Sequence, residues 1–180
     1  MASGRCHDWA TKKIAVPSAI GMGLIVYPIA GLPAIIPAFL FTFFGLMAQR
    51  IMSPDLDQQQ ITFSEYLVNR LNPIVGKMWE MYWWAYSAAI PHRHFISHFP
   101  IISTIIRIIY LFLPFYLLSF FDIKPLKIFF DLAFYYWDYS LYFILGMIIA
   151  DIGHYCLDYN YWLKNKMERI VAKQYRRKKQ

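Results

Sequence analysis

The chain contains an uninterrupted run of 34 residues, 14–47, without a single charged side chain. At about 1.5 Å per residue, one helix of this length would measure about 51 Å, well beyond a membrane hydrocarbon core of about 30 Å. The sequence "AGLP" at 30–33 breaks the run near its centre, because Gly and Pro disfavour a continuous helix. The run therefore predicts two short membrane spans of about 17 residues each, joined by a turn.

The rest of the composition favours the same class of protein. Of the 180 residues, 58% are hydrophobic and only 16% are charged, and the apolar residues lie in long runs. A third span is expected at about 100–121 and a fourth at about 135–157. The predicted fold class is all-α: a polytopic membrane protein with about four transmembrane helices and an interfacial aromatic helix at 77–90.

The distribution of basic residues predicts the orientation. With four spans, the segments 1–13, 48–99 and 158–180 share one side of the membrane and hold 15 of the 18 Lys and Arg residues. Because basic residues mark the cytoplasmic side, both termini are predicted to be cytoplasmic. We interpret 159–180 as a basic cytoplasmic tail that contacts anionic lipid, and we do not expect a nucleic-acid partner.

Four polar clusters lie next to the ends of the predicted spans: "HD" at 7, "SPDLD" at 53, "HRHFISH" at 92 and "HYCLD" at 154. An even number of crossings returns the chain to the same face, so all four clusters are predicted to meet at one aqueous surface. If 14–47 formed a single span, the first cluster would lie on the opposite face from the other three.

The carboxylates in these clusters have two interpretations each. His154 and Asp158 are four residues apart, so on a helix they share one face, with Asp151 one turn earlier. A carboxylate near hydrocarbon is costly unless it is paired or ligated, so this pair either locks a helix end by a hydrogen bond or binds a metal. Asp55 and Asp57 are either turn formers or oxygen ligands for a divalent metal.

The histidine-rich segment is ambiguous from spacing alone. His94 and His98 have helical spacing, whereas His92 and His98 lie six apart and need irregular backbone to act together. Arg93 could neutralise an anionic substrate such as a phosphate. The alternative is a set of interfacial histidines at the level of the lipid headgroups.

The joint pattern favours a metal site. His7 alone would be read as solvent-exposed, but every histidine of the chain lies in one of three clusters that the topology brings to one surface. Cys6 and Cys156 flank two of these histidines, so thiolate ligation is an alternative to their being small buried residues. Mixed imidazole and carboxylate ligands suit Zn²⁺ or Mn²⁺.

The motifs "SGRCHD", "SPDLD", "PHRHFISH", "RIIYL" and "HYCLD" follow one another over residues 3–158. These motifs, in this order, resemble those of a prokaryotic family of uncharacterised metal-binding membrane proteins. More distantly, the chain is similar to inner-membrane metal-dependent hydrolases whose expression responds to DNA damage. The resemblance implies a multi-pass protein of the inner or another internal prokaryotic membrane. "RLNP" at 70 and "WWAY" at 83 depart from the family pattern and put the approach to the site in doubt more than the ligands.

The resemblance also implies a ligand set. Because the family keeps two histidines six residues apart, it favours His92 and His98 over His94. The implied metal ligands are His7, Asp55, Asp57, His92, His98, His154 and Asp158.

Seven ligands exceed the four of a structural zinc site, which indicates two metals or one metal with an open position. The sequence predicts a metal-dependent hydrolase at the cytoplasmic interface, acting on a phosphate-containing or lipid substrate, with Asp55, Asp57 and Arg93 as catalytic residues. The alternative is a non-catalytic protein in which the metal clamps structure, is stored or is sensed. A transporter is less expected because its polar residues would lie near mid-membrane. Residues 1–158 are predicted to form one membrane-embedded metal-binding domain.

Overall fold

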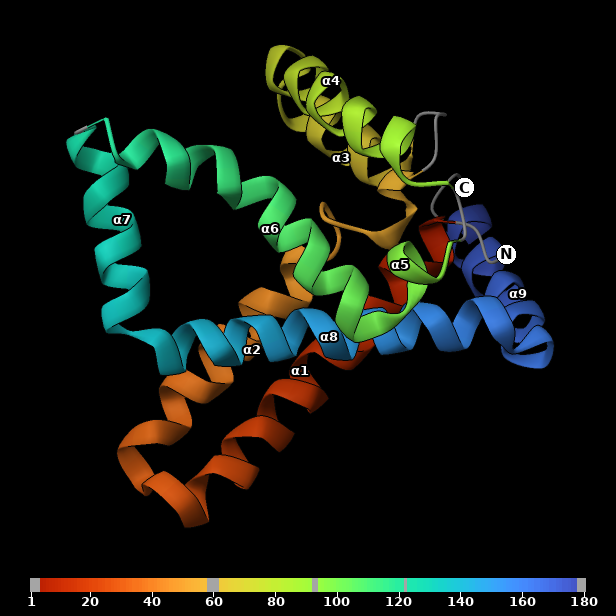
Figure 1. Ribbon diagram of the computed structural model, residues 1–180. Helices are drawn as coiled ribbons and strands as arrows, with labels where there is room; N and C mark the ends of the chain where they lie inside the picture. The colour runs from red at the N-terminus through yellow and green to blue at the C-terminus, as the bar shows by residue number, and fades with distance from the viewer. Residues whose placement is uncertain (1–3, 58–61, 92–93, 122, 178–180) are drawn as a thin grey trace.

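The computed structural model describes residues 4–57, 62–91, 94–121 and 123–177 (Figure 1). Within these residues the regular secondary structure is helical throughout. In chain order, the elements are α1 (Gly4–Ala30), η1 (Leu32–Ala34), α2 (Ile35–Ala48), η2 (Pro54–Asp57), α3 (Phe63–Leu71), α4 (Pro73–Ala89), α5 (Phe95–His98), α6 (Pro100–Ser119), α7 (Lys124–Tyr135), α8 (Trp137–Tyr159) and α9 (Tyr161–Arg177).

Among the described residues, the three helices α1, α6 and α8 are long and apolar enough to cross a membrane. The predicted all-α fold class is confirmed, and these helices are consistent with a multi-pass membrane protein. The second predicted span corresponds to a shorter apolar helix, Leu32–Ala48. The first predicted span begins about ten residues earlier than expected, so His7 lies on α1 itself rather than before it.

The turn predicted at 30–33 is present and reverses the chain between α1 and α2 (Figure 1). Gly31 has φ 77°, a left-handed conformation that side chains with a Cβ rarely adopt. Its N–H donates to the Tyr27 carbonyl at 2.9 Å and so closes the end of α1. Pro33 follows in the short η1 turn. The hairpin returns the chain to the end where α1 began.

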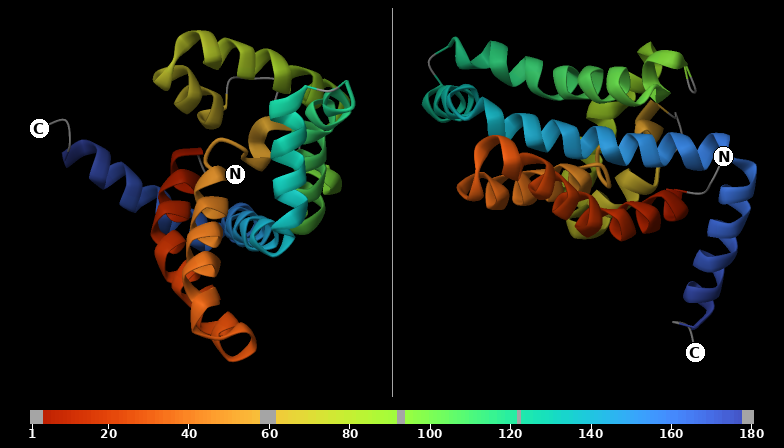
Figure 2. Two further views of the ribbon diagram at one scale, coloured as in Figure 1. Left: turned by 90° about the vertical axis from the view of Figure 1, so that its left-hand side faces the viewer. Right: turned by 90° about the horizontal axis from the view of Figure 1, so that it is seen from below.

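Close backbone contact fixes α2 against α8. A Cβ added to Gly45 would collide with the Phe143 carbonyl, and one added to Gly146 would collide with the Thr42 carbonyl. The two glycines therefore let the helix backbones approach each other directly, as small residues do between membrane helices. Helix α1 completes this three-helix unit through a cluster of buried apolar side chains, Ala15, Leu46 and Ala150. Helix α6 lies along the other side of α8 (Figure 2).

The predicted interfacial aromatic helix corresponds to α4, which forms a hairpin with α3. Tyr82 and Tyr110 bind each other's backbone reciprocally, each hydroxyl donating to the other residue's carbonyl at 2.6 Å. Trp83 and Tyr86 are buried against the same part of α6. Trp84 on the opposite face of α4 is 67% exposed. The hairpin thus holds to the bundle by one face and presents apolar side chains outward on the other.

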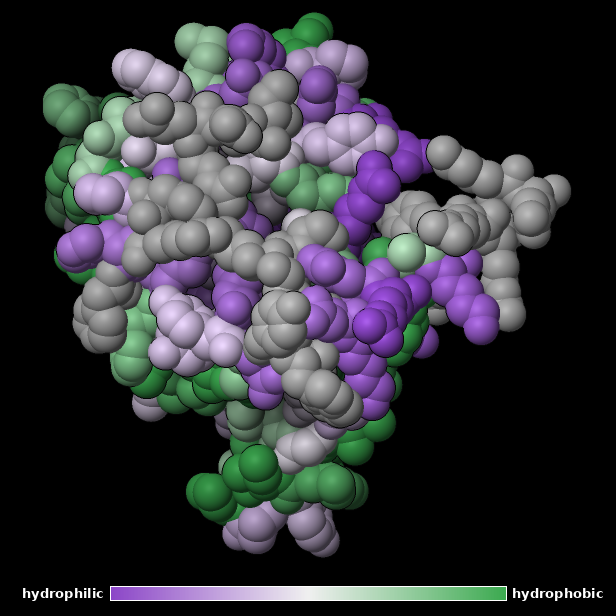
Figure 3. Space-filling view, turned by 90° about the vertical axis from the view of Figure 1, so that its right-hand side faces the viewer, coloured by the Kyte–Doolittle hydropathy of each residue, from purple (hydrophilic) through white to green (hydrophobic). Residues whose placement is uncertain are grey.

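The basic segment 159–180 is folded over most of its described length. It forms α9, whose Met167 and Val171 pack against Cys6 and Leu157. The start of α1, the end of α8, η2 and α5 meet beside it at one end of the molecule (Figure 1). Polar residues gather over this end, whereas apolar residues cover the α1–α2 turn below it (Figure 3).

Candidate metal centre

The η2 turn presents its two carboxylates in different directions. The Asp55 N–H donates to Ser53 Oγ at 3.3 Å, and the Leu56 N–H donates to the Ser53 carbonyl at 3.1 Å, which ties the turn to the residue just before it. Leu56 is buried beneath the aromatic side chains of α4. With Leu56 held inward, Asp55 faces α1 and α8, and Asp57 faces α5.

Two imidazoles from distant parts of the chain stack at the centre of the site. The rings of His7 on α1 and His154 on α8 lie 3.6 Å apart between centroids and 10° from parallel. His7 Nε2 is 3.1 Å from one oxygen of Asp158, and His154 Nε2 is 3.4 Å from the other. Asp55 Oδ1 approaches His154 Nε2 at 3.5 Å from the η2 side. All four residues come from elements that the predicted topology places at one face.

The donor set fits a divalent metal. Among the described residues, two groups of three have ligand atoms within 4.8 Å of one another, and both contain His154. One group adds His7 and Asp55, and the other adds His98 and Asp158. His7 Nδ1 is buried without a hydrogen-bond partner in the described part of the chain, a costly arrangement that a bound ion would relieve.

Asp57 lies behind His98 rather than in either group. Its Oδ2 is 3.4 Å from His98 Nδ1, and Ser97 Oγ is 3.1 Å from the same nitrogen. Asp57 is 1% exposed and His98 is 5% exposed. A carboxylate on the far nitrogen of a metal-binding histidine typically fixes the orientation of the ring. Asp57, a ligand by sequence prediction, thus has the geometry of a positioning residue.

The remaining predicted residues of the histidine segment do not join the cluster. His94 is exposed, and its Nδ1 accepts a hydrogen bond from the Ile96 N–H at 3.3 Å. His92 and Arg93 lie outside the described residues. The structure therefore brings together six of the predicted residues: His7, Asp55, Asp57, His98, His154 and Asp158.

The carboxyl of Asp55 stays ionised despite its burial. Burial would raise the pKa of its carboxyl, but the imidazoles of His154 and His7 outweigh this effect and lower the pKa to about 2. At neutral pH the side chain is therefore a carboxylate, the form that binds a metal.

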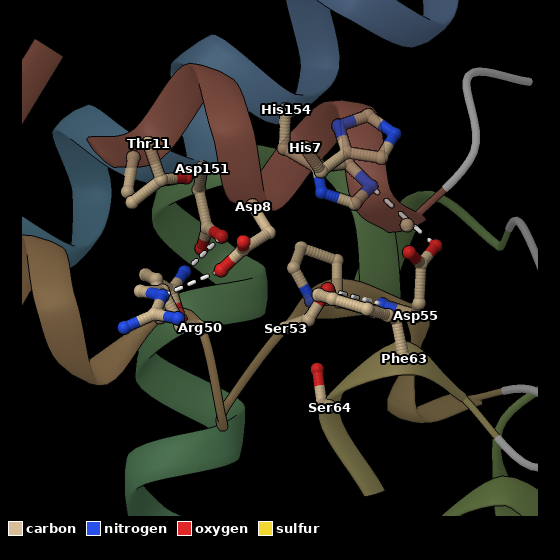
Figure 4. A pocket seen from close by; sticks show the side chains of 14 residues that line it. His7, Asp8, Thr11, Arg50, Ser53, Asp55, Phe63, Ser64, Asp151 and His154 are labelled. Atoms are coloured by element: carbon tan, nitrogen blue, oxygen red, sulfur yellow. Dashed lines mark hydrogen bonds and ion pairs between the residues drawn. The ribbon is translucent and has the colours of Figure 1, made fainter. Parts of the chain in front are cut away.

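A pocket opens beside the cluster and contains residues that sequence reasoning missed (Figure 4). The volume open to the centre of a water-sized sphere is about 20 Å³, which is enough for a water molecule or a metal ion. Asp8 lies on the wall and is paired with Arg50 at 2.5 Å and with Lys12 at 2.7 Å. The signal in the sequence was the position of these charges, at the two ends of the long apolar run.

A second buried charge pair lies behind the pocket. Arg107 on α6 is fully buried and forms an ion pair with Asp151 on α8. Gln49 at the end of α2 donates to Asp151 and accepts from Arg107, and Arg107 also donates to the Met52 carbonyl. This network connects α2, α6 and α8 with the segment that leads to η2.

The fold and the site together define a helical, membrane-type protein with a buried histidine and carboxylate centre at one end. The chain belongs to the family described as uncharacterized metal-binding protein (DUF2227), which matches residues 2–170. This confirms the resemblance to an uncharacterised metal-binding family. No curated protein and no solved structure matches the chain.

Proposed function

We propose that this protein is an integral-membrane hydrolase that uses Zn²⁺ or Mn²⁺ to cleave phosphoesters at the cytoplasmic interface. The proposal depends on one observation above all. A buried set of imidazoles and carboxylates that fits a divalent metal shares its pocket with a positively charged group. A structural metal site would have no need of an adjoining pocket that reaches solvent.

Five residues are proposed to hold the metal, and they exceed the four of a closed structural site: His7, Asp55, His98, His154 and Asp158. When bound, a divalent metal in such a site supplies a Lewis acid and lowers the pKa of bound water toward about 7. Asp55 contributes a negative ligand, and Asp57 holds the His98 ring in place through Nδ1. The burial of these side chains limits the access of bulk water.

The charge of the pocket supports a phosphoester substrate. Arg50 lines the pocket and is paired with Asp8, which Lys12 also holds. The other two carboxylates of the lining, Asp55 and Asp151, lie against His154 and Arg107. An arginine next to a metal stabilises the extra negative charge that develops when a phosphoryl group is transferred. The sequence predicted this role for Arg93, which lies outside the described residues; we propose it for Arg50, which lines the pocket.

The test compares metal content and turnover in two histidine variants. Full-length protein in detergent, supplied with Zn²⁺ or Mn²⁺, is assayed on a phosphomonoester and on a phosphodiester. His154→Ala should lose bound metal and turnover, because His154 belongs to both ligand groups. His94→Ala removes an exposed imidazole outside the cluster and should keep both. Equal turnover in the two variants would refute the proposal.

A non-catalytic clamp is the second candidate, and one observation favours it. The stacked pair His7 and His154 joins α1 to α8, so a metal here would tie distant segments together. A clamp should unfold when the metal is chelated, whereas a hydrolase should keep its helical content and rebind the ion. Circular dichroism before and after treatment with a chelator separates the two functions.

A further inference from the structure

The first turn of α3 faces the pocket with unused backbone donors. A capping box satisfies two of the N–H groups at the helix start: Glu65 N–H donates to Thr62 Oγ1 at 3.2 Å, and Thr62 N–H donates to Glu65 Oε2 at 2.6 Å. Phe63 and Ser64, whose backbone N–H groups lie between these two, line the pocket. In the described part of the chain these two N–H groups make no hydrogen bond. Helix starts of this kind attract anions.

The side chain of Ser64 gives an independent indication of a ligand. Ser64 is 3% exposed, yet its hydroxyl makes no hydrogen bond within the described residues. Figure 4 shows the hydroxyl directed into the pocket, toward Ser53 and Asp8. The hydroxyl is therefore available to donate to, or accept from, a molecule bound in the pocket. The pocket is where such a partner would lie.

Arg50 lines the same pocket and supplies a cation, with its side chain directed toward Asp8 (Figure 4). Its Nε donates to Asp8 at 2.5 Å, and its two terminal nitrogens make no hydrogen bond among the described residues. Lys12 holds the other oxygen of Asp8 at 2.7 Å, so the carboxylate is offset by two positive charges. Glu65 is turned back onto the start of α3 and does not line the pocket.

Gly4 allows these groups to meet. A Cβ added to Gly4 would lie 2.6 Å from Phe63 Cβ, so any larger residue would push the start of α3 away from the start of α1. The glycine thereby brings the α3 donors to the pocket that contains His7.

We propose that the start of α3, the Ser64 hydroxyl and the Arg50 guanidinium form a binding subsite for an oxygen of a phosphate group beside the metal centre. The subsite deepens the proposed function, on which it rests, because it assigns the part of the chain that recognises the phosphoester. Backbone N–H groups, a hydroxyl and a guanidinium are the donors that proteins use to bind phosphate oxygens. A neutral ester or amide carries no negative charge, so these donors would bind it less strongly than a phosphate.

Phosphate binding is measured directly by calorimetry on zinc-loaded, full-length protein in detergent, with inorganic phosphate as the probe. Ser64→Ala and Arg50→Gln should each raise the Kd for phosphate by about tenfold or more, because each removes a hydrogen bond to a charged ligand. Arg70→Gln removes an exposed positive charge outside the pocket and should leave the Kd unchanged. Zinc content should equal that of the wild type in Ser64→Ala.

An unchanged Kd in Ser64→Ala overturns the subsite, even if Arg50→Gln loses zinc through its effect on Asp8. The protein could also bind phosphate through Ser64 and turn over no phosphoester. That result would refute the proposed hydrolase function and support the subsite. The last comparison is between two ligands: phosphatidic acid in mixed micelles and glycerol 3-phosphate in solution. Tighter binding of the micellar lipid identifies a headgroup as the ligand, whereas equal binding identifies a soluble phosphate.

Discussion

The pair formed by Arg107 and Asp151 should control both the stability of the helix bundle and the affinity for metal. Both side chains are at most 1% exposed. Asp151 also accepts hydrogen bonds from Gln49 and Thr104, so its carboxylate is surrounded by donors. Replacement of Arg107 by Met removes the positive charge and also the donor that holds the Met52 carbonyl, just before η2.

The expected magnitude follows from burial. Removal of one partner of a buried ion pair costs about 3–5 kcal/mol, because the remaining charge has no counterion. For a chain of this size, each kcal/mol lowers Tm by about 2–4 °C, so Arg107→Met should lower Tm on the order of 10 °C. Replacement of both residues by apolar side chains removes the isolated charge. The double variant Arg107→Met with Asp151→Leu should therefore be more stable than Arg107→Met alone.

The measurement is a double-mutant cycle of thermal unfolding in one detergent, with zinc affinity determined on the same samples. Arg107→Met should also weaken zinc binding, because the segment that carries Asp55 loses its connection to α6. The reasoning is refuted if the two single variants lose stability additively in the double variant. It is also refuted if Arg107→Met lowers Tm by less than about 2 °C, since that would mean that the pair is hydrated.

Three further predictions concern the metal and the helix contacts. Acidification should release metal with uptake of protons by the imidazoles, measured by dialysis over a series of pH values, because metal binding needs neutral imidazoles whereas Asp55 with its pKa of about 2 stays ionised until a much lower pH. Asp57→Asn should weaken zinc binding about 10- to 100-fold with unchanged stoichiometry, because it perturbs the orientation of His98, and an unchanged affinity would contradict this role. Gly146→Ala should destabilise the protein by about 1–3 kcal/mol in thermal unfolding, since its Cβ would strike a carbonyl of α2. Gly21→Ala, with open space around Gly21, is the matched control and should be neutral or slightly stabilising.

The sequence predicted the features that depend on local chemistry. A Gly and Pro break in an apolar run is enough to predict the turn at Gly31, and the turn is enough to bring His7 and Asp55 to one end. The spacing of His154 and Asp158 predicted their common helix face. The turn and the common helix face required only neighbouring residues, whereas the meeting of His7 and Asp55 also required the number of crossings between them.

The features that the sequence did not predict depend on how helices rotate against one another. Arg107 in an apolar span had no partner that sequence spacing could identify, because Asp151 lies on a different helix. The place of Asp57 behind His98, rather than among the ligands, is decided by the direction in which Leu56 packs. The hydroxyl of Ser64 became notable only when its burial was known.

The stacking of His7 against His154 has a consequence for biogenesis, since the two rings belong to the first and the last of the long helices. Helix α1 is synthesised first, and α8 follows only after all the intervening helices. Only the arrival of α8 gives His7 its neighbouring ring and its carboxylate. The proposed centre is therefore complete only after α8 has been made, so an ion that needs both His7 and His154 would be bound late in the synthesis of the chain.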